Sequence, residues 1–161
     1  MRIAVMGAGS IGGYFGGMLA RGGNDVSLIA RGAHLEAIRS NGLKVVRDDE
    51  EFTVQCQATD DPSEVGPVDL ALLCVKTYHN DIALPLMLPL IGPDTSVLCL
   101  QNGVDSYQAA AKVLGERVVL PAAAFIEAGT LGPGMVKQTG EVVKIILGEP
   151  NSGETPRCLE I

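Results

Sequence analysis

The sequence predicts an α/β fold of the Rossmann type, a mostly parallel sheet with helices on both faces and an antiparallel β extension toward the C-terminal end. Three observations carry this prediction. Apolar runs of strand length alternate with segments of helical spacing, a glycine-rich turn joins the first run to the first helix, and 47% of the residues are apolar. A length of 161 residues fits one domain over residues 1–161.

The first half of the chain begins with a strand, a turn and a helix. Residues 1–6 form a short, mainly apolar run with β-branched side chains, and residues 11–21 suit a helix that ends at Gly22-Gly23. The elements expected next are a strand at 26–30, a helix at 33–40, a hairpin at 43–56 around the acidic turn 48–51, a short Pro-initiated helix at 61–64 and a strand at 68–75. The βα alternation predicts parallel strands with a ligand at their carboxyl ends.

The second half continues this alternation and then changes. Residues 78–91 are apolar, but Pro85 and Pro89 predict that a helix there is short, kinked or broken. The elements expected next are a strand at 95–100, a helix at 104–114, a strand at 117–123, and an antiparallel pair of 135–139 with 142–147 after Gly132-Pro133-Gly134. Residues 151–155 predict a polar connector, and residues 157–161 the first turn of a further element.

Composition and charge argue against several classes of protein. A formal net charge of −7 opposes broad binding to nucleic acid or anionic lipid. Residues 3–20 are uncharged and contain GxxxG spacings, but six glycines between Gly7 and Gly17 argue against a membrane helix and against a signal peptide. The four cysteines lack CxxC spacing, and His34 and His79 stand alone. We therefore expect a cytoplasmic protein with reduced thiols and no metal site.

A dinucleotide-binding fingerprint follows the first predicted strand. The run Gly7-Ala8-Gly9-Ser10-Ile11-Gly12 matches GxGxxG at the opening of a helix, which is the context that gives this motif its meaning. Gly7 permits the tight turn, Gly9 lets the backbone approach a diphosphate, and Gly12 allows the helix to pack closely on the strand. Backbone N–H groups at the positive end of the helix dipole would then face the phosphates. The alternative is a glycine-rich turn that binds nothing.

The end of the second strand indicates which dinucleotide is bound. An NAD site places Asp or Glu there to accept the ribose 2′-OH, whereas this sequence has Ala30-Arg31-Gly32. Arg31 can pair with a 2′-phosphate, so the sequence favours NADP(H), unless Arg31 is simply a solvated side chain. Lys76 and Asn102 follow two further strands and are candidates for contacts with the cofactor or with a substrate carboxylate. The alternative for Lys76 is that it only terminates a strand, and the alternative for Asn102 is that it forms an ordinary turn with Gly103.

Five blocks of sequence resemble the ketopantoate reductase (2-dehydropantoate 2-reductase) family. They are GAGSIGGYFGGMLARGG at 7–23, IARG at 29–32, VKT at 75–77, QNG at 101–103 and GPGMV at 132–136. The resemblance implies NADPH-dependent reduction of 2-dehydropantoate to pantoate, on the way to coenzyme A. It also implies diphosphate binding by residues 7–12, 2′-phosphate binding by Arg31, and roles for Lys76, Asn102 and the backbone near Glu127 beside the nicotinamide.

The resemblance further implies a second, helical domain that supplies the catalytic Lys, so no catalytic residue is expected in residues 1–161. Hydride comes from the cofactor, and the protein must add orientation and a proton donor. We expect this chain to bind NADPH without turnover and to expose an apolar face, which invites self-association as a homo-oligomer. Two alternatives remain: a related dehydrogenase acting on another 2-keto acid, and a non-catalytic NADP(H)-binding sensor or interaction module.

Overall fold

The computed structural model describes residues 1–48, 50–103, 105–150 and 155–161. The strands are β1 (Arg2–Met6), β2 (Asp25–Ile29), β3 (Leu43–Arg47), β4 (Glu50–Val54), β5 (Gln57–Thr59), β6 (Leu70–Leu73), β7 (Ser96–Cys99), β8 (Val119–Gly132) and β9 (Met135–Leu147). The α-helices are α1 (Ser10–Arg21), α2 (Gly32–Asn41), α3 (Asn80–Leu86), α4 (Ser106–Leu114) and α5 (Pro156–Glu160).

The strands of the described residues form one sheet in the order β4-β3-β9-β8-β7-β6-β1-β2-β5. The pairs β3–β4 and β8–β9 are antiparallel, and all other neighbouring pairs are parallel. The predicted Rossmann-type fold with an antiparallel β extension is therefore confirmed. Because β1, β2, β6 and β7 run in the same direction, the loops that follow them meet at one edge of the sheet.

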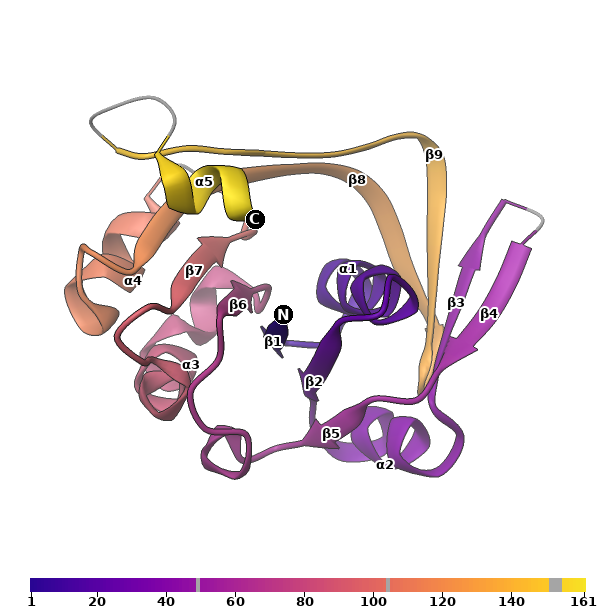
Figure 1. The fold of residues 1–161 in the computed structure, drawn as a ribbon. Coiled ribbons are helices and arrows are strands. Elements are labelled where there is room, and N and C mark those ends of the chain that lie inside the picture. Colours follow the sequence, from indigo (N-terminus) through magenta and orange to yellow (C-terminus); the bar gives the residue numbers. More distant parts are fainter. Residues whose placement is uncertain (49, 104, 151–154) are drawn as a thin grey trace.

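The sheet curls around α1, and β8 and β9 pass over this helix before they descend beside β3 and β4 (Figure 1). Leu35 and Ile38 of α2 join the cluster of buried side chains on this inner side. Buried residues of α3 and α4, among them Leu84 and Ala110, pack in a second cluster. Helices therefore cover both faces of the sheet, as the βα alternation predicts.

Three glycines let α1 lie inside the curled sheet. A Cβ atom at Gly16 would lie 2.8 Å from Leu28 of β2, and one at Gly13 would lie 2.8 Å from Val136 of β9. At Gly17 the distance to Val45 of β3 would be 2.5 Å. The GxxxG spacings therefore mark close packing of a helix against strands on two sides. No helix of the described residues is long and apolar enough to span a membrane.

The antiparallel pair near the C-terminal end differs from the prediction. Residues 135–139 and 142–147 do not pair with each other but form one strand, β9, which pairs with β8 along most of its length. The hairpin turn lies at Pro133-Gly134, where Gly134 adopts a positive φ of 71°. The predicted pairing of 135–139 with 142–147 requires a turn at residues 140–141. These residues belong instead to a bulge, because the register shifts between Ile126↔Val143 and Glu127↔Thr139.

Other local predictions have mixed outcomes. The region 78–91 is broken, as Pro85 and Pro89 predict, into 3₁₀ turns on either side of the short α3. Strand β5 was missed because it is three residues long, and the strand at 117–123 extends to Gly132 as β8. Three predictions fall partly outside the described residues: the acidic turn at Asp49, the helix start at Val104 and the connector at residues 151–154.

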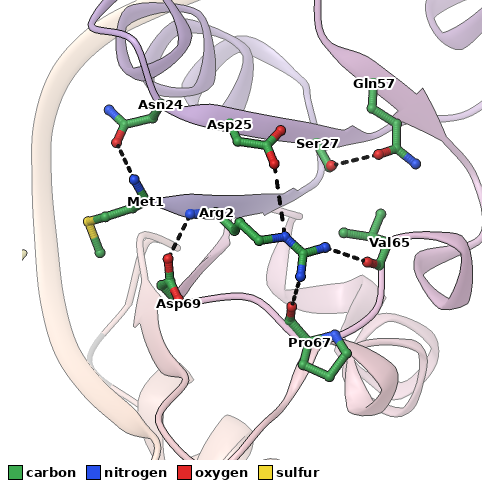
Figure 2. A network of polar contacts seen from close by, with 9 residues as sticks. All are labelled: Met1, Arg2, Asn24, Asp25, Ser27, Gln57, Val65, Pro67 and Asp69. Atoms are coloured by element: carbon green, nitrogen blue, oxygen red, sulfur yellow. Dashed lines mark hydrogen bonds and ion pairs between the residues drawn. The ribbon is translucent and has the colours of Figure 1, made fainter.

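Polar contacts of Arg2 hold the amino ends of the central strands together (Figure 2). Its guanidinium donates to the carbonyl oxygens of Val65 at 3.0 Å and Pro67 at 2.9 Å. Its backbone N–H donates to the Asp69 carboxylate at 2.7 Å, just before β6. These contacts lie at the amino ends of β1 and β6. The candidate site lies at the opposite edge of the sheet, at the carboxyl ends of these strands.

Candidate functional site

The glycine-rich turn after β1 is held by the neighbouring strand β2. The backbone N–H groups of Gly7 and Ala8 both donate to the carbonyl oxygen of Ile29, at 3.1 and 3.0 Å. Gly7 has a φ of 98°, and a Cβ atom there would lie 2.7 Å from the side chain of Val75. Only glycine fits this conformation and this close approach. The N–H groups of Gly7 and Ala8 are therefore already hydrogen-bonded within the protein.

The N-terminus of α1 carries the free donors instead. Gly9 is the N-cap, has no side-chain cap, and its carbonyl accepts the first helical hydrogen bond, from Gly13 N–H at 2.7 Å. The N–H groups of residues 9–12 therefore have no partner within the helix, and the helix dipole makes this end positive. A Cβ atom at Gly9 would have no neighbouring atom within 4 Å, so the space in front of the helix is open.

Two cavities meet at this helix end. The first has a volume of about 570 Å³, and the second one of about 600 Å³, each large enough for part of a drug-sized ligand. Of the residues predicted from the sequence, Gly7, Ala8, Gly9 and Arg31 line the first cavity. Ser10, Ile11, Lys76, Asn102 and Glu127 line the second. Gly12 lines neither: it packs against the turn, since a Cβ there would lie 2.1 Å from the Gly7 carbonyl oxygen.

Arg31 stands at the end of β2 in extended backbone and is exposed beside the first cavity. It forms no ion pair with any residue in the described part of the chain. Asp60, which follows β5, lines the same cavity, as do the apolar side chains of Ile82 and Leu86. The first cavity therefore combines an available guanidinium with an apolar wall.

A pair of buried amides, missed from the sequence, joins the loops that carry Lys76 and Asn102. Gln101 Nε2 donates to the Val75 carbonyl at 2.7 Å and to Asn80 Oδ1 at 2.7 Å. Asn80 Nδ2 returns a hydrogen bond to Gln101 Oε1 at 3.3 Å. Gln101 directly precedes Asn102, and Val75 directly precedes Lys76, so this pair sets the spacing of the two loops. The position of Gln101 beside a predicted site residue was the available signal.

His34 was also missed, because the sequence shows no partner near it. Its Nε2 lies 2.7 Å from the carbonyl oxygen of Ala8 in the glycine-rich turn. Its Nδ1 accepts a hydrogen bond of 3.0 Å from the backbone N–H of Gly134 at the β8–β9 turn. No local pattern could reveal this contact, because Gly134 lies 100 positions further along the chain.

Two cysteines lie at the carboxyl ends of central strands: Cys74 follows β6, and Cys99 is the last residue of β7. Burial raises the pKa of the Cys74 thiol to about 12, with the neighbouring Cys99 adding to the shift, and burial raises the pKa of Cys99 to about 12 as well. The reactive thiolate is therefore scarce at neutral pH. Within the ranges described, no three His, Cys, Asp or Glu side chains gather as metal ligands.

Glu127, which lines the second cavity, places its carboxylate against the bulge at Gly140.

The fold, the glycine-rich turn and the two cavities define a Rossmann-type α/β domain with its open site at the carboxyl ends of the strands. A family model described as "Ketopantoate reductase PanE/ApbA" matches residues 3–152. The chain belongs to this ketopantoate reductase family.

Individual relatives agree with the family. The 2-dehydropantoate 2-reductase of Lactococcus lactis subsp. lactis (strain IL1403) is 34% identical over 161 residues, which cover 96% of this chain and 52% of that protein. The crystal structure of 2-dehydropantoate 2-reductase from Porphyromonas gingivalis W83 has a TM-score of 0.91 and 37% identity, over 99% of this chain and 58% of that one. The structure of D-mandelate dehydrogenase with NADH and anilino(oxo)acetate has a TM-score of 0.86 and 31% identity, over 95% of this chain and 50% of that one. The chain spans about half the length of these relatives.

Proposed function

We propose that residues 1–161 form the NADP(H)-binding domain of a cytoplasmic 2-dehydropantoate 2-reductase, which reduces a 2-keto acid to (R)-pantoate. The observation that carries the proposal is the uncapped N-terminus of α1 between two cavities, with Arg31 in one and Lys76 and Asn102 in the other. Membership of the ketopantoate reductase family supports it. Free cysteines in the described residues fit a reducing compartment.

Each cavity then takes one half of the dinucleotide. The N–H groups at Gly9, Ser10 and Ile11 donate to the diphosphate at the positive helix end. On the first side, Arg31 pairs with the 2′-phosphate, and the apolar wall formed by Ile82 and Leu86 accepts the adenine.

On the second side, Lys76 and Asn102 orient the nicotinamide and the substrate carboxylate, together with the backbone near Glu127. NADPH supplies the hydride when it is bound. We place the proton donor outside these residues, as the family resemblance implies.

A titration of the purified chain with NADPH and with NADH tests the cofactor proposal. We expect the wild-type chain to bind NADPH more tightly. Arg31→Ala should weaken NADPH by about 10- to 100-fold, the value of one or two charge-assisted hydrogen bonds, and leave NADH within about twofold. Arg47→Ala on β3 removes the same charge away from both cavities and is the matched control. Equal loss of both cofactors in Arg31→Ala would mean that Arg31 does not contact the phosphate.

A related dehydrogenase acting on another 2-keto acid is the second candidate, because D-mandelate dehydrogenase has a similar structure and was solved with NADH. Steady-state assays with 2-dehydropantoate and with the keto acid of mandelate, in the protein that contains this domain, distinguish the two. We expect preference for 2-dehydropantoate and NADPH. The chain of 161 residues by itself should bind NADPH without turnover, and normal reductase rates from it would contradict this division of labour.

A further inference from the structure

His34 uses both of its ring nitrogens to join two segments that line the first cavity. It is the third residue of α2 and is partly buried. One contact is with the carbonyl oxygen of Ala8, in the turn that leads into α1, and the other is with the N–H of Gly134, at the tip of the β8–β9 hairpin. Residues on both sides of this connection line the cavity: Gly7 and Gly9 on one side, and Gly132 and Pro133 on the other.

The two contacts determine the tautomer of the imidazole. The Gly134 N–H is a donor, so the Nδ1 atom that it contacts must carry a lone pair. The proton of the neutral ring is therefore on Nε2, where it donates to the Ala8 carbonyl at 2.7 Å. An acceptor at Nδ1 and a donor at Nε2 are what these two backbone groups require.

The contact with Ala8 has a consequence for the next amide. In a trans peptide the C=O of one residue and the N–H of the following residue point in opposite directions. The described residues contain no cis peptide bond, so a fixed Ala8 C=O also fixes the direction of the Gly9 N–H. That N–H points away from His34, at the uncapped end of α1. The other side of Ala8 is already held, because its own N–H donates to Ile29.

We propose that His34 is a positioning residue for the dinucleotide: its Nε2–H holds the Ala8–Gly9 peptide so that the Gly9 N–H is aimed at the diphosphate. This inference rests on the proposed function. The Nδ1 contact keeps the ring in place by docking it against the hairpin tip, where Gly134 also accepts from Lys44 N–H at 2.9 Å. A Cβ atom at Gly134 would lie 2.9 Å from Ala37, so the tip rests directly on α2.

Two substitutions separate the two contacts. In His34→Asn, the side-chain oxygen can take the place of Nδ1, but the side chain is too short to reach Ala8. In His34→Gln, the amide nitrogen can reach the place of Nε2 and donate to Ala8. We expect His34→Asn to bind NADPH about tenfold more weakly, the value of one hydrogen bond to a charged group, and His34→Gln to stay within about threefold of wild type. Glu36→Ala, on the exposed side of α2, is the matched control.

The affinity for a second ligand distinguishes positioning of the diphosphate from a merely structural role of His34. Adenosine 2′-monophosphate contains the 2′-phosphate and the adenine but no diphosphate. His34 also lines the cavity that we assign to these two groups, so the comparison is relative: His34→Asn should lose less affinity for adenosine 2′-monophosphate than for NADPH. Equal loss of NADPH and of adenosine 2′-monophosphate in His34→Asn would overturn the proposal, as would wild-type affinity for NADPH in that variant.

A measurement on the wild-type chain keeps the proposal testable if a variant does not fold. Long-range ¹H–¹⁵N NMR of the imidazole nitrogens should show the proton of His34 on Nε2, and a proton on Nδ1 would overturn the proposal. Failure of the wild-type chain to bind NADPH is a different result, because it would contradict the proposed function itself.

Discussion

Replacement of Gly12 by alanine tests the packing of α1 on the turn that precedes it. Alanine is favoured over glycine in a helix by about 1 kcal/mol, so propensity alone predicts stabilisation. A Cβ at position 12, however, would lie 2.1 Å from the Gly7 carbonyl oxygen, 2.8 Å from Val5 Cγ1 and 2.9 Å from Cys74 Cβ. Normal contact needs the Gly7 carbonyl to move by about 1 Å. It cannot retreat freely, because Gly7 already lies against the backbone of Val75.

Overpacking of this kind costs typically 1–3 kcal/mol, and a backbone clash belongs at the upper end, about 3 kcal/mol. After the propensity gain, Gly12→Ala should lower the free energy of unfolding by about 2 kcal/mol, or the thermal midpoint by about 4–8 °C. Thermal and urea unfolding followed by circular dichroism measure both. The matched control is Gly16→Ala in the same helix, where the Cβ would approach only side-chain ends of Leu28 and Val5, at 2.8 and 3.2 Å.

Gly16→Ala should lose less stability than Gly12→Ala and stay within about 1 kcal/mol of wild type. The ends of the buried Leu28 and Val5 side chains shift at a lower cost than a backbone carbonyl, and the propensity gain offsets part of the strain. The reasoning is refuted if Gly12→Ala unfolds at the same temperature as Gly16→Ala. It is also refuted if Gly12→Ala is the more stable of the two, since propensity would then outweigh the clash with the turn.

Two further predictions concern the loops of the second cavity and the C-terminal segment. Asn80→Ala should lower the free energy of unfolding by about 1–3 kcal/mol, because the buried Gln101 side chain loses one donor and one acceptor. Urea titrations measure this change, and unchanged stability would show that the amide pair is dispensable. Hydrogen bonding from Arg157, and then Thr155, lowers the pKa of Glu149 to about 2. A lowered pKa stabilises the fold above the ordinary carboxyl value, and this contribution disappears as the pH falls from about 4.5 to about 2. At pH 7, Glu149→Gln should therefore be less stable than wild type by about 1 kcal/mol. In acid the two stabilities should converge, and a stability difference that does not change with pH would contradict the ion pair between Glu149 and Arg157.

The first part of the fold could be predicted because its signals are local. Strand, glycine turn, helix and second strand lie within 30 consecutive residues, and Gly7 has a local reason, its positive φ. Gly13 and Gly17 belong to the same run, but their reason is contact with the distant β9 and β3. The same locality placed Arg31, Lys76 and Asn102 after their strands, and the structure brings them to the two cavities. The β8–β9 hairpin was mispredicted because Gly140 resembles a turn residue, whereas pairing with the distant β8 makes it part of a bulge.

The sequence by itself determined the order of strands and helices, the glycine-rich entry to α1 and the absence of an acidic residue at the end of β2. Only the tertiary structure decided that the sheet curls around α1, that Gln101 joins two loops, and that His34 lies between Ala8 and Gly134. The physical reason is the range of the interactions. Backbone preferences and hydrophobic periodicity act over a few residues, whereas hydrogen bonds between segments 100 positions apart exist only after the strands between them have paired.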